Sequence, residues 1–308
     1  MTPSRRTGYL LCTISAIVWA GTAPGIKYLL DVYHVPGVTL AFWRDVFVTI
    51  AVLGYLLIAN RPALRISAAD FKPLALLGVV SIGIYHALWI WSVSLNGAAI
   101  AVVLIYLFPT FVTIGAWFFF KEPLRRIQVI GLVLSLIGMG LLVKLYDPEQ
   151  LKLNWLGIVV GLLTAFLQAG YVLYTQKAVR TVNPWASLGV TMGTGALALL
   201  VVLLAAPLAV GNAAAPGIFA VGDVTAWLIL IGLAIGPTLG GYALFNLSLQ
   251  HIPASIGGLI LVLEAPTASA IAILFLGEQL VTPQYAGMAL IFVSILLPTL
   301  WKQTHTTA

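Results

Sequence analysis

Charged residues are scarce in this sequence, and their scarcity limits what the protein can be. Asp, Glu, Lys and Arg make up 8% of the 308 residues, whereas a typical soluble domain has about 25%. Hydrophobic residues make up 61%, and the mean hydropathy is +1.07. Apolar runs of about twenty residues, enough to cross ~30 Å of hydrocarbon, recur from end to end. This composition excludes a soluble fold and predicts an all-α polytopic membrane protein surrounded by a lipid bilayer.

Cysteine and several chemical motifs are also nearly or wholly missing. Cys12 is the single cysteine, so an internal disulfide, a thiolate metal cluster and an iron–sulfur site are excluded. The sequence has neither an H-E-x-x-H metal motif nor a G-x-x-x-x-G-K-[ST] phosphate loop. We therefore expect no enzyme activity, no cofactor, no metal and no direct use of ATP. The net charge of +6 comes from short basic loops beside apolar runs, which indicates membrane orientation rather than nucleic-acid binding.

Ten apolar stretches alternate with short segments that carry turn or charge signals. The first stretch follows Arg5 and Arg6, as in a signal peptide, but its apolar run continues to Leu30. We therefore interpret it as a retained span. The predicted spans are residues 8–30, 37–59, 72–94, 98–120, 127–144, 155–176, 185–208, 226–248, 253–276 and 284–301.

Lys and Arg are unequally divided between alternate loops, and this asymmetry predicts the orientation of the chain. With the N-terminus in the cytoplasm, eleven of these residues fall in segments inside the cell. Only Lys144 and Lys152 fall in outside loops. We expect both termini in the cytoplasm.

The sequence repeats weakly at a spacing of 156 residues. "EPLRRIQVIG" (Glu122–Gly131) aligns with "EQLVTPQYAG" (Glu278–Gly287), and a proline, Pro109 or Pro266, lies in the span before each. This predicts two five-helix units, residues 1–146 and 147–308, of which the second enters the membrane inverted because five is odd. Inverted repeats around a central cavity are the architecture of many secondary transporters, which work by alternating access. We interpret Glu122 and Glu278 as turn or helix-terminus residues.

These paired motifs and the opening span "SAIVWAGTAPGIKYLL" resemble the drug/metabolite transporter superfamily, in particular its ten-span EamA-type members. The resemblance covers nearly the whole chain and implies an exporter of the bacterial inner membrane with a cavity between its two halves. It is most similar to the exporters of aromatic amino acids, which implies an amino acid or a similar small metabolite as substrate. Efflux of hydrophobic or cationic drugs by the same fold is the alternative. A monomer is compatible with these observations.

Glu264 stands in "LILVLEAPTASAIAIL", with no other charged side chain between Gln250 and Gly277. A charge at bilayer depth costs at least ~2.5 kcal/mol, and intramembrane carboxylates usually serve a function. Glu264 would meet a substrate ammonium or exchange a proton. The alternative is a structural carboxyl that is protonated or hydrogen-bonded between packed helices.

Aromatic residues with a few polar groups suit a ligand that is itself a ring with polar groups. His86 and Tyr242 are related by the repeat, and helical spacing places Tyr85 and Trp89 on one face. Tryptophan and tyrosine also collect at membrane interfaces as anchors, which is the alternative for each aromatic residue. With Glu264, the predicted substrate-binding residues are Trp19, Tyr85, His86, Trp89, Tyr106, Gln168, Tyr171, Tyr242 and Asn246.

Three residues in interrupted spans are predicted hinges: Pro24 in "GTAPG", and Gly236 and Pro237 in "GLAIGPTLGG". Small residues at such spacing also serve close helix packing, which is the alternative. Arg44 and Asp45 are expected near the outer end of their span, where snorkelling and a mutual ion pair explain them. A charged vestibule at the outer mouth is the other interpretation.

Overall fold

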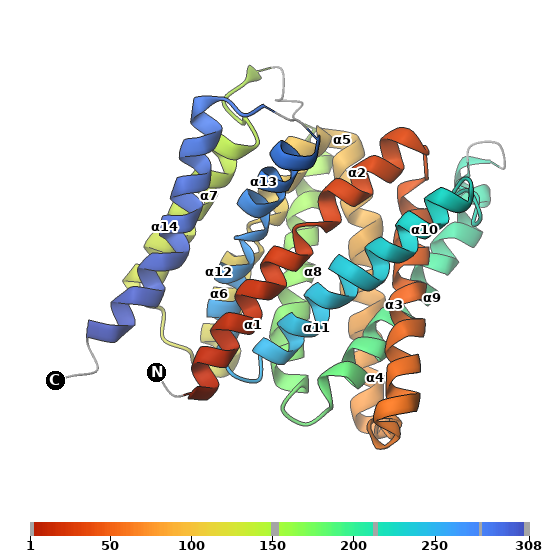
Figure 1. Cartoon of the computed structure of the whole chain (residues 1–308), viewed down its shortest axis with the longest axis horizontal. Coiled ribbons are helices and arrows are strands. Elements are labelled where there is room, and N and C mark those ends of the chain that lie inside the picture. The colour runs from red at the N-terminus through yellow and green to blue at the C-terminus, as the bar shows by residue number, and fades with distance from the viewer. Residues whose placement is uncertain (1–2, 149–153, 212–214, 277–278, 305–308) are drawn as a thin grey trace.

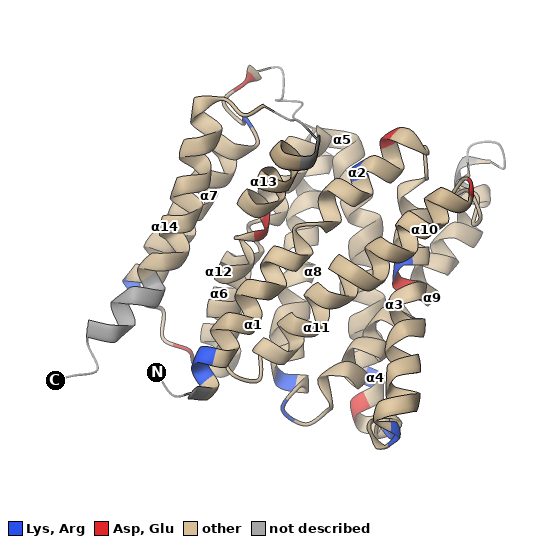
Figure 2. Cartoon of the chain, in the orientation of Figure 1, with Lys and Arg blue, Asp and Glu red and all other residues tan. Residues whose placement is uncertain are grey.

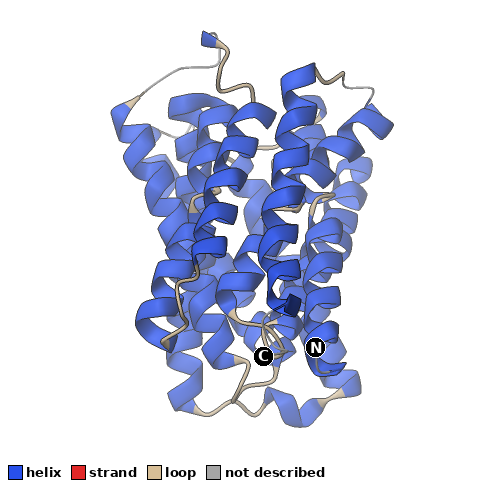
Figure 3. Ribbon diagram, turned by 90° about the vertical axis from the view of Figure 1, so that its left-hand side faces the viewer, coloured by secondary structure: helices blue, strands red, loops and turns tan. Residues whose placement is uncertain are grey.

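The computed structural model describes residues 3–148, 154–211, 215–276 and 279–304, and within these ranges it contains helices and no strands. The helices stand side by side as one bundle, and both chain termini lie at the same end of it (Figure 1). The view turned by 90° shows the same bundle with its connecting loops at the two ends (Figure 3). The α-helices are α1 (Pro3–Trp19), α2 (Thr22–Val32), α3 (Gly37–Ala59), α4 (Ala68–Gly78), α5 (Tyr85–Ile105), α6 (Phe108–Phe120), α7 (Arg126–Leu142), α8 (Trp155–Ala178), α9 (Pro184–Val210), α10 (Val224–Leu233), α11 (Leu239–Ser248), α12 (Ala254–Leu261), α13 (Glu264–Leu276) and α14 (Thr282–Thr304). Three short elements join them: the 3₁₀ helix η1 (Arg61–Leu64) and the π-helical segments η2 (Val79–Ile84) and η4 (Ala234–Thr238).

Seven helical runs in the described residues are long and apolar enough to cross a membrane. They are Ser4–Val32, Gly37–Ala59, Ala68–Ile105, Trp155–Ala178, Pro184–Leu208, Val224–Ser248 and Ala254–Leu274. Three shorter apolar helices accompany them, Phe108–Phe120, Arg126–Leu142 and Thr282–Leu297. The prediction of an all-helical membrane protein is confirmed at this level.

The break expected between the third and fourth predicted spans, at residues 95–97, is a kink inside α5 and not a loop between helices. Helix α5 runs on through this kink to Ile105, and the fourth predicted span consists of the end of α5 followed by α6. The change of direction is made inside α5 at Gly97, whose φ of 76° and ψ of 165° are not helical. Glycine takes a positive φ without the steric cost that a Cβ atom brings. A single glycine therefore turns the chain here without a loop.

Four other breaks between helices each lie about one turn before a proline, whereas the passage from α4 to η2 has no proline after it. Proline has no backbone N–H, so the carbonyl four residues earlier loses its helical partner. Helix α1 ends just before that position for Pro24, and α10 ends at that position for Pro237. The breaks between α5 and α6 and between α12 and α13 have the same relation to Pro109 and Pro266. Prolines thus set the depth at which these runs are interrupted.

Close helix packing in the bundle depends on small residues. The main neighbouring pairs are α7 with α14, α5 with α8, α3 with α9, and α1 with α11. Where α7 crosses α14, a Cβ atom on Gly138 would lie 2.7 Å from the carbonyl oxygen of Gly287. Two glycines facing each other let the backbones approach, as is usual between membrane helices.

Lys and Arg gather at the end of the bundle where both termini lie, whereas Asp and Glu are scattered (Figure 2). In that view the ribbon carries acidic residues at middle depth at the start of α13 and on α3. These positions belong to two polar regions inside the bundle.

Candidate functional site

A cavity of about 590 Å³ lies between the helices of both halves of the chain. Its walls are mainly apolar and aromatic, and they come from α1, α2, α3, α5, α6, α7, α8, α11, α12, α13 and α14. It begins beside the breaks at Phe108 and Leu261 and extends toward the end of the bundle away from the termini, where Leu30, Val143 and Leu280 line it. Its volume lies within the range of ligand sites in proteins.

Eight of the ten predicted substrate-binding residues line this cavity. The rings of Trp19 and Tyr242 lie 4.2 Å apart between centroids, so α1 and α11 make one aromatic wall together. The rings of Tyr85 and His86 on α5 lie 5.1 Å apart. The eight are Trp19, Tyr85, His86, Trp89, Tyr106, Gln168, Tyr242 and Glu264.

Glu264 is the first residue of α13, directly after the break that follows α12. The interruption brings its side chain to the cavity wall, where it is half-buried. Tyr106, beside the matching break between α5 and α6, lies near the carboxyl group and interacts with it electrostatically. The phenol of Tyr85 also lies close enough to Glu264 to interact electrostatically with its carboxyl group. A carboxyl group flanked by two phenols therefore faces the interior of the cavity.

Tyr171 and Asn246 do not line the cavity, contrary to what their positions in the sequence suggested. The Tyr171 hydroxyl donates to the side-chain oxygen of Asn246 over 3.1 Å, and both residues are buried. The Tyr171 ring packs edge-on against Tyr242, 5.5 Å away between centroids. These two residues support the aromatic wall from behind, because Tyr171 packs against Tyr242 and its hydroxyl is bound to Asn246.

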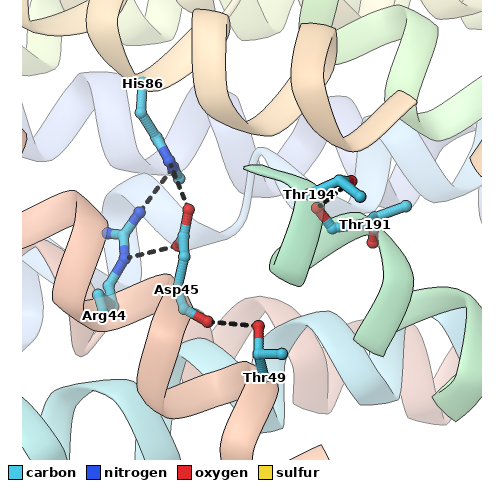
Figure 4. Close-up of polar contacts among 6 residues, drawn as sticks. All are labelled: Arg44, Asp45, Thr49, His86, Thr191 and Thr194. Atoms are coloured by element: carbon cyan, nitrogen blue, oxygen red, sulfur yellow. Dashed lines mark hydrogen bonds and ion pairs between the residues drawn. The ribbon is translucent and has the colours of Figure 1, made fainter. Parts of the chain in front are cut away.

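Arg44, Asp45 and His86 form a buried cluster that the sequence did not reveal. Nη2 of Arg44 lies 2.6 Å from Nε2 of His86, and Nδ1 of His86 lies 3.3 Å from a carboxylate oxygen of Asp45 (Figure 4). Arg44 and His86 are each 6% exposed and Asp45 is 0% exposed. The expected ion pair of Arg44 and Asp45 is present, with 3.8 Å between Nε of Arg44 and a carboxylate oxygen of Asp45, but snorkelling at the membrane surface was the wrong interpretation because both side chains are buried. Both lie inside the protein, and His86 on α5 joins them.

A signal for this cluster was present in the sequence. Arg44 and Asp45 stand well inside an apolar stretch, as His86 does in another, and charges at such positions usually pair with one another. Arg44 and His86 also line the cavity, while Asp45 lies behind them. The Asp45 main-chain carbonyl accepts from the Thr49 hydroxyl over 2.7 Å, one turn further along α3 (Figure 4).

The three predicted hinge residues lie at the helix breaks. Pro24 is in the first turn of α2, and Gly236 and Pro237 are inside the π-helical segment η4. The breaks face each other, since a Cβ atom on Gly21 would lie 3.5 Å from Pro237. Around Gly236 itself there is open space, because a Cβ atom added there would meet no atom within 4 Å.

The end of the bundle near the termini is held together by polar contacts between distant segments. The Ser255 hydroxyl at the start of α12 donates to Glu122, which follows α6. The Ser4 hydroxyl lies 2.9 Å from Nδ1 of His251. Glu122 thus ties two helices together at this end, while Glu278, its partner in the repeat, lies outside the described residues. The described residues contain no group of three or more His, Cys, Asp or Glu side chains that could hold a metal ion.

A family comparison identifies the kind of protein that carries this cavity. Residues 6–144 and again residues 155–300 match the model of the EamA-like transporter family. The chain belongs to the EamA-like transporter family. Its members, within the drug/metabolite transporter superfamily, are transporters and not enzymes. The resemblance inferred from the paired motifs is confirmed.

Curated relatives of this EamA-like protein are mostly transporters of uncharacterized function. It is 28% identical over 266 residues to a probable terminal-alkyne amino-acid exporter of Streptantibioticus cattleyicolor, covering 86% of this chain and 84% of the relative. It is 22% identical to an uncharacterized inner membrane transporter, YicL, of Salmonella typhimurium, over 99% of both chains. One solved crystal structure superposes with a TM-score of 0.79 at 18% identity, over 97% of this chain and 99% of the other. That likeness concerns the fold alone.

Proposed function

We propose that this protein exports amino acids, aromatic or other neutral ones, across a bacterial inner membrane by alternating access. The observation that carries the proposal is the cavity itself: aromatic walls from both halves of the chain surround Glu264, the one carboxylate that lines it among the described residues. Aromatic side chains bind an apolar side chain or ring, and Glu264 binds the ammonium group. A chamber of about 590 Å³ has room for such a solute.

Two inverted five-helix units, residues 1–146 and 147–308, supply the mechanism. The family model matches the chain twice, once in each unit. The break at Tyr106–Leu107 and the break at Val262–Leu263 lie 156 residues apart, the spacing of the sequence repeat. The π-helical segments η2 and η4 also stand at nearly that spacing. Equivalent interruptions in both units favour a duplicated scaffold of ten spans.

Packing between the units has the same symmetry. A Cβ atom on Gly8 would strike His251 and Ile252, which follow the end of α11. A Cβ atom on Gly157 would strike Leu95 and Asn96 in α5, 156 residues before those partners. Opposed copies of one contact are what an inverted repeat requires, and rocking the two units would open the cavity to either side in turn. In this account Pro24, Gly236 and Pro237 are the hinges.

The distribution of Lys and Arg favours a cytoplasmic location for both termini. The cavity then extends toward the outer face, and the contacts of Glu122 with Ser255 and of Ser4 with His251 close the inner face. The amino-acid exporter among the curated relatives supports the substrate class, because it is named for an amino acid.

Efflux of hydrophobic cations is the second candidate, because Glu264 and aromatic walls would serve such solutes equally well. Counterflow in proteoliposomes separates the two. We expect labelled phenylalanine to exchange and a quaternary amine of similar size not to. Exchange of the amine without phenylalanine would replace the proposed function with the second one.

A further inference from the structure

The cluster of Arg44, Asp45 and His86 is not required by the helix scaffold. When Pro36, directly before α3, is aligned with Pro184, the first residue of α9, Met192 stands where Arg44 stands, and Tyr242 is related to His86 by the 156-residue spacing. Met192 is fully buried, so the other half of the chain folds with an apolar side chain at this place. Buried charges cost desolvation free energy that an apolar side chain does not. A reason other than folding is therefore needed for this cluster.

Hydrogen-bond chemistry fixes the protonation state of His86 in this arrangement. A guanidinium group has only donors, so Nε2 of His86, 2.6 Å from Arg44 Nη2, must accept with its lone pair. The imidazole is then neutral and its proton is on Nδ1. That nitrogen lies 3.3 Å from a carboxylate oxygen of Asp45. The cluster contains one cation, one anion and one neutral ring, and its net charge is zero.

A proton on Nε2 of His86 and the contact with Arg44 exclude each other. Protonation turns the acceptor into a donor and places an imidazolium next to a guanidinium, while Asp45 stabilises the imidazolium from the other side. Both oxygens of the Asp45 carboxylate are buried without a hydrogen-bond partner in the described structure, so they can accept from the charged ring. Arg44 and His86 line the cavity, so a displaced guanidinium has the cavity to turn into.

We propose that Nε2 of His86 is the proton-binding atom of this transporter, and that a proton there frees Arg44 to receive an acidic group of the substrate. Proton and carboxylate then bind together, since each requires the same Arg44–His86 contact to open. This inference rests on the proposed function, because it needs a cavity-bound solute with a carboxylate. By linkage, binding of that solute takes up a proton, and its affinity rises as the pH falls.

Other titratable groups surround the cluster. Among the described residues, the charged groups that face His86 are Arg44 and Asp45 on α3. Tyr85 on α5 lies near Arg44 and Glu264, and Tyr242 on α11 lies near Arg44 and Asp45. Glu264 should have the opposite effect on the pH dependence of substrate affinity, because a proton on its carboxyl group competes with a substrate ammonium. An amine without a carboxylate therefore serves as the comparison ligand.

Calorimetry on the purified, full-length protein tests the proposal, with phenylalanine and phenethylamine as probes. Titrations in buffers of different ionisation enthalpy count the protons taken up on binding. We expect uptake with phenylalanine and none with phenethylamine, and a phenylalanine affinity that rises by up to about tenfold for each unit the pH falls within pH 5–8, where imidazoles titrate. In His86→Gln, which keeps an acceptor but cannot be protonated, the proton uptake and the rise in phenylalanine affinity at low pH should vanish. His34→Gln, an exposed histidine outside the cavity lining, should behave like the native protein.

The native protein alone decides the outcome if His86→Gln does not fold. Phenylalanine binding without proton uptake and with constant affinity across this pH range would overturn the inference and leave the proposed function standing. Proton uptake that persists unchanged in a folded His86→Gln would also overturn it. If neither probe bound, and phenylalanine failed in counterflow, the proposed function would fail first and this inference with it.

Discussion

The two halves of the chain, residues 3–148 and 154–304, share their backbone irregularities but not their charges. Helix breaks and π-helical segments recur at nearly matching positions in both. The buried ion cluster of Arg44, Asp45 and His86 occurs in the first half, and the cavity carboxylate Glu264 in the second, where the first half has Phe108. This comparison separates a scaffold, which both halves can form, from the chemistry, which each half holds once. Substitutions of the unshared residues should therefore act differently from substitutions at shared packing positions.

The largest effect is expected from Asp45→Asn. The variant leaves the buried Arg44 guanidinium without its counter-charge, and breaking a buried ion pair in this way costs about 3–5 kcal/mol. We expect a strong loss of folded protein, measured as monodisperse yield after size-exclusion chromatography and as the thermal unfolding midpoint. The control is Asp31→Asn, an exposed carboxylate on α2. Normal stability of Asp45→Asn would show that Asp45 does not hold the cluster together.

Glu264→Gln should act on transport instead of folding. A hydrogen bond to a charged group contributes about 1.5–3 kcal/mol, so loss of the carboxylate should lower substrate exchange about 10- to 100-fold. The folded yield should stay near that of the native protein, because the side chain faces a cavity. Initial rates of phenylalanine counterflow in proteoliposomes measure the effect. Full counterflow activity of the variant would show that the Glu264 carboxylate takes no part in transport.

Gly138→Ala tests a packing position between α7 and α14. The added methyl group would lie 2.7 Å from the carbonyl oxygen of Gly287, and overpacking of this kind costs about 1–3 kcal/mol. We expect a lower thermal midpoint with unchanged substrate preference. Gly236→Leu is the matched comparison, because a Cβ atom at that position meets open space. If Gly236 is a hinge, that variant should fold normally and transport slowly. Normal transport would show that Gly236 is not a hinge.

Tyr171→Phe should have the smallest effect of these variants. It removes the hydrogen bond to Asn246 behind the cavity wall, which costs about 0.5–1.5 kcal/mol. We expect a slightly lower thermal midpoint and an unchanged apparent affinity for phenylalanine in counterflow. A change in affinity much larger than the change in stability would place Tyr171 at the substrate after all.

Most of the fold was accessible from the sequence because membrane spans are set by local composition. Apolar stretches of sufficient length predict helices in lipid without reference to their neighbours. The turn inside α5 at Gly97 was not predicted in its form, because a short turn and a continued helix have the same composition.

The cavity residues could be predicted only in part. Trp19, Tyr85 and Glu264 were found because aromatic and charged residues in deep positions are informative on their own. Tyr171 and Asn246 were expected on the cavity but lie behind its wall, and only three-dimensional packing shows that the hydroxyl of one donates to the amide oxygen of the other. The link from Arg44 to His86 was missed for the same reason, as it joins residues 42 positions apart.

The orientation of the two halves tests the central claim most directly. Single cysteines at Lys121, after α6, and at Val281, before α14, can be introduced into a Cys12→Ala background, and both positions are exposed. Lys121 directly precedes the first motif of the repeat and Val281 lies within the second, so an inverted duplication places them on opposite sides of the membrane. We predict that a membrane-impermeant maleimide labels the cysteine at position 281 in intact cells, and the one at position 121 only after permeabilisation. Labelling of both from the same side would contradict the inverted architecture and the transport mechanism built on it.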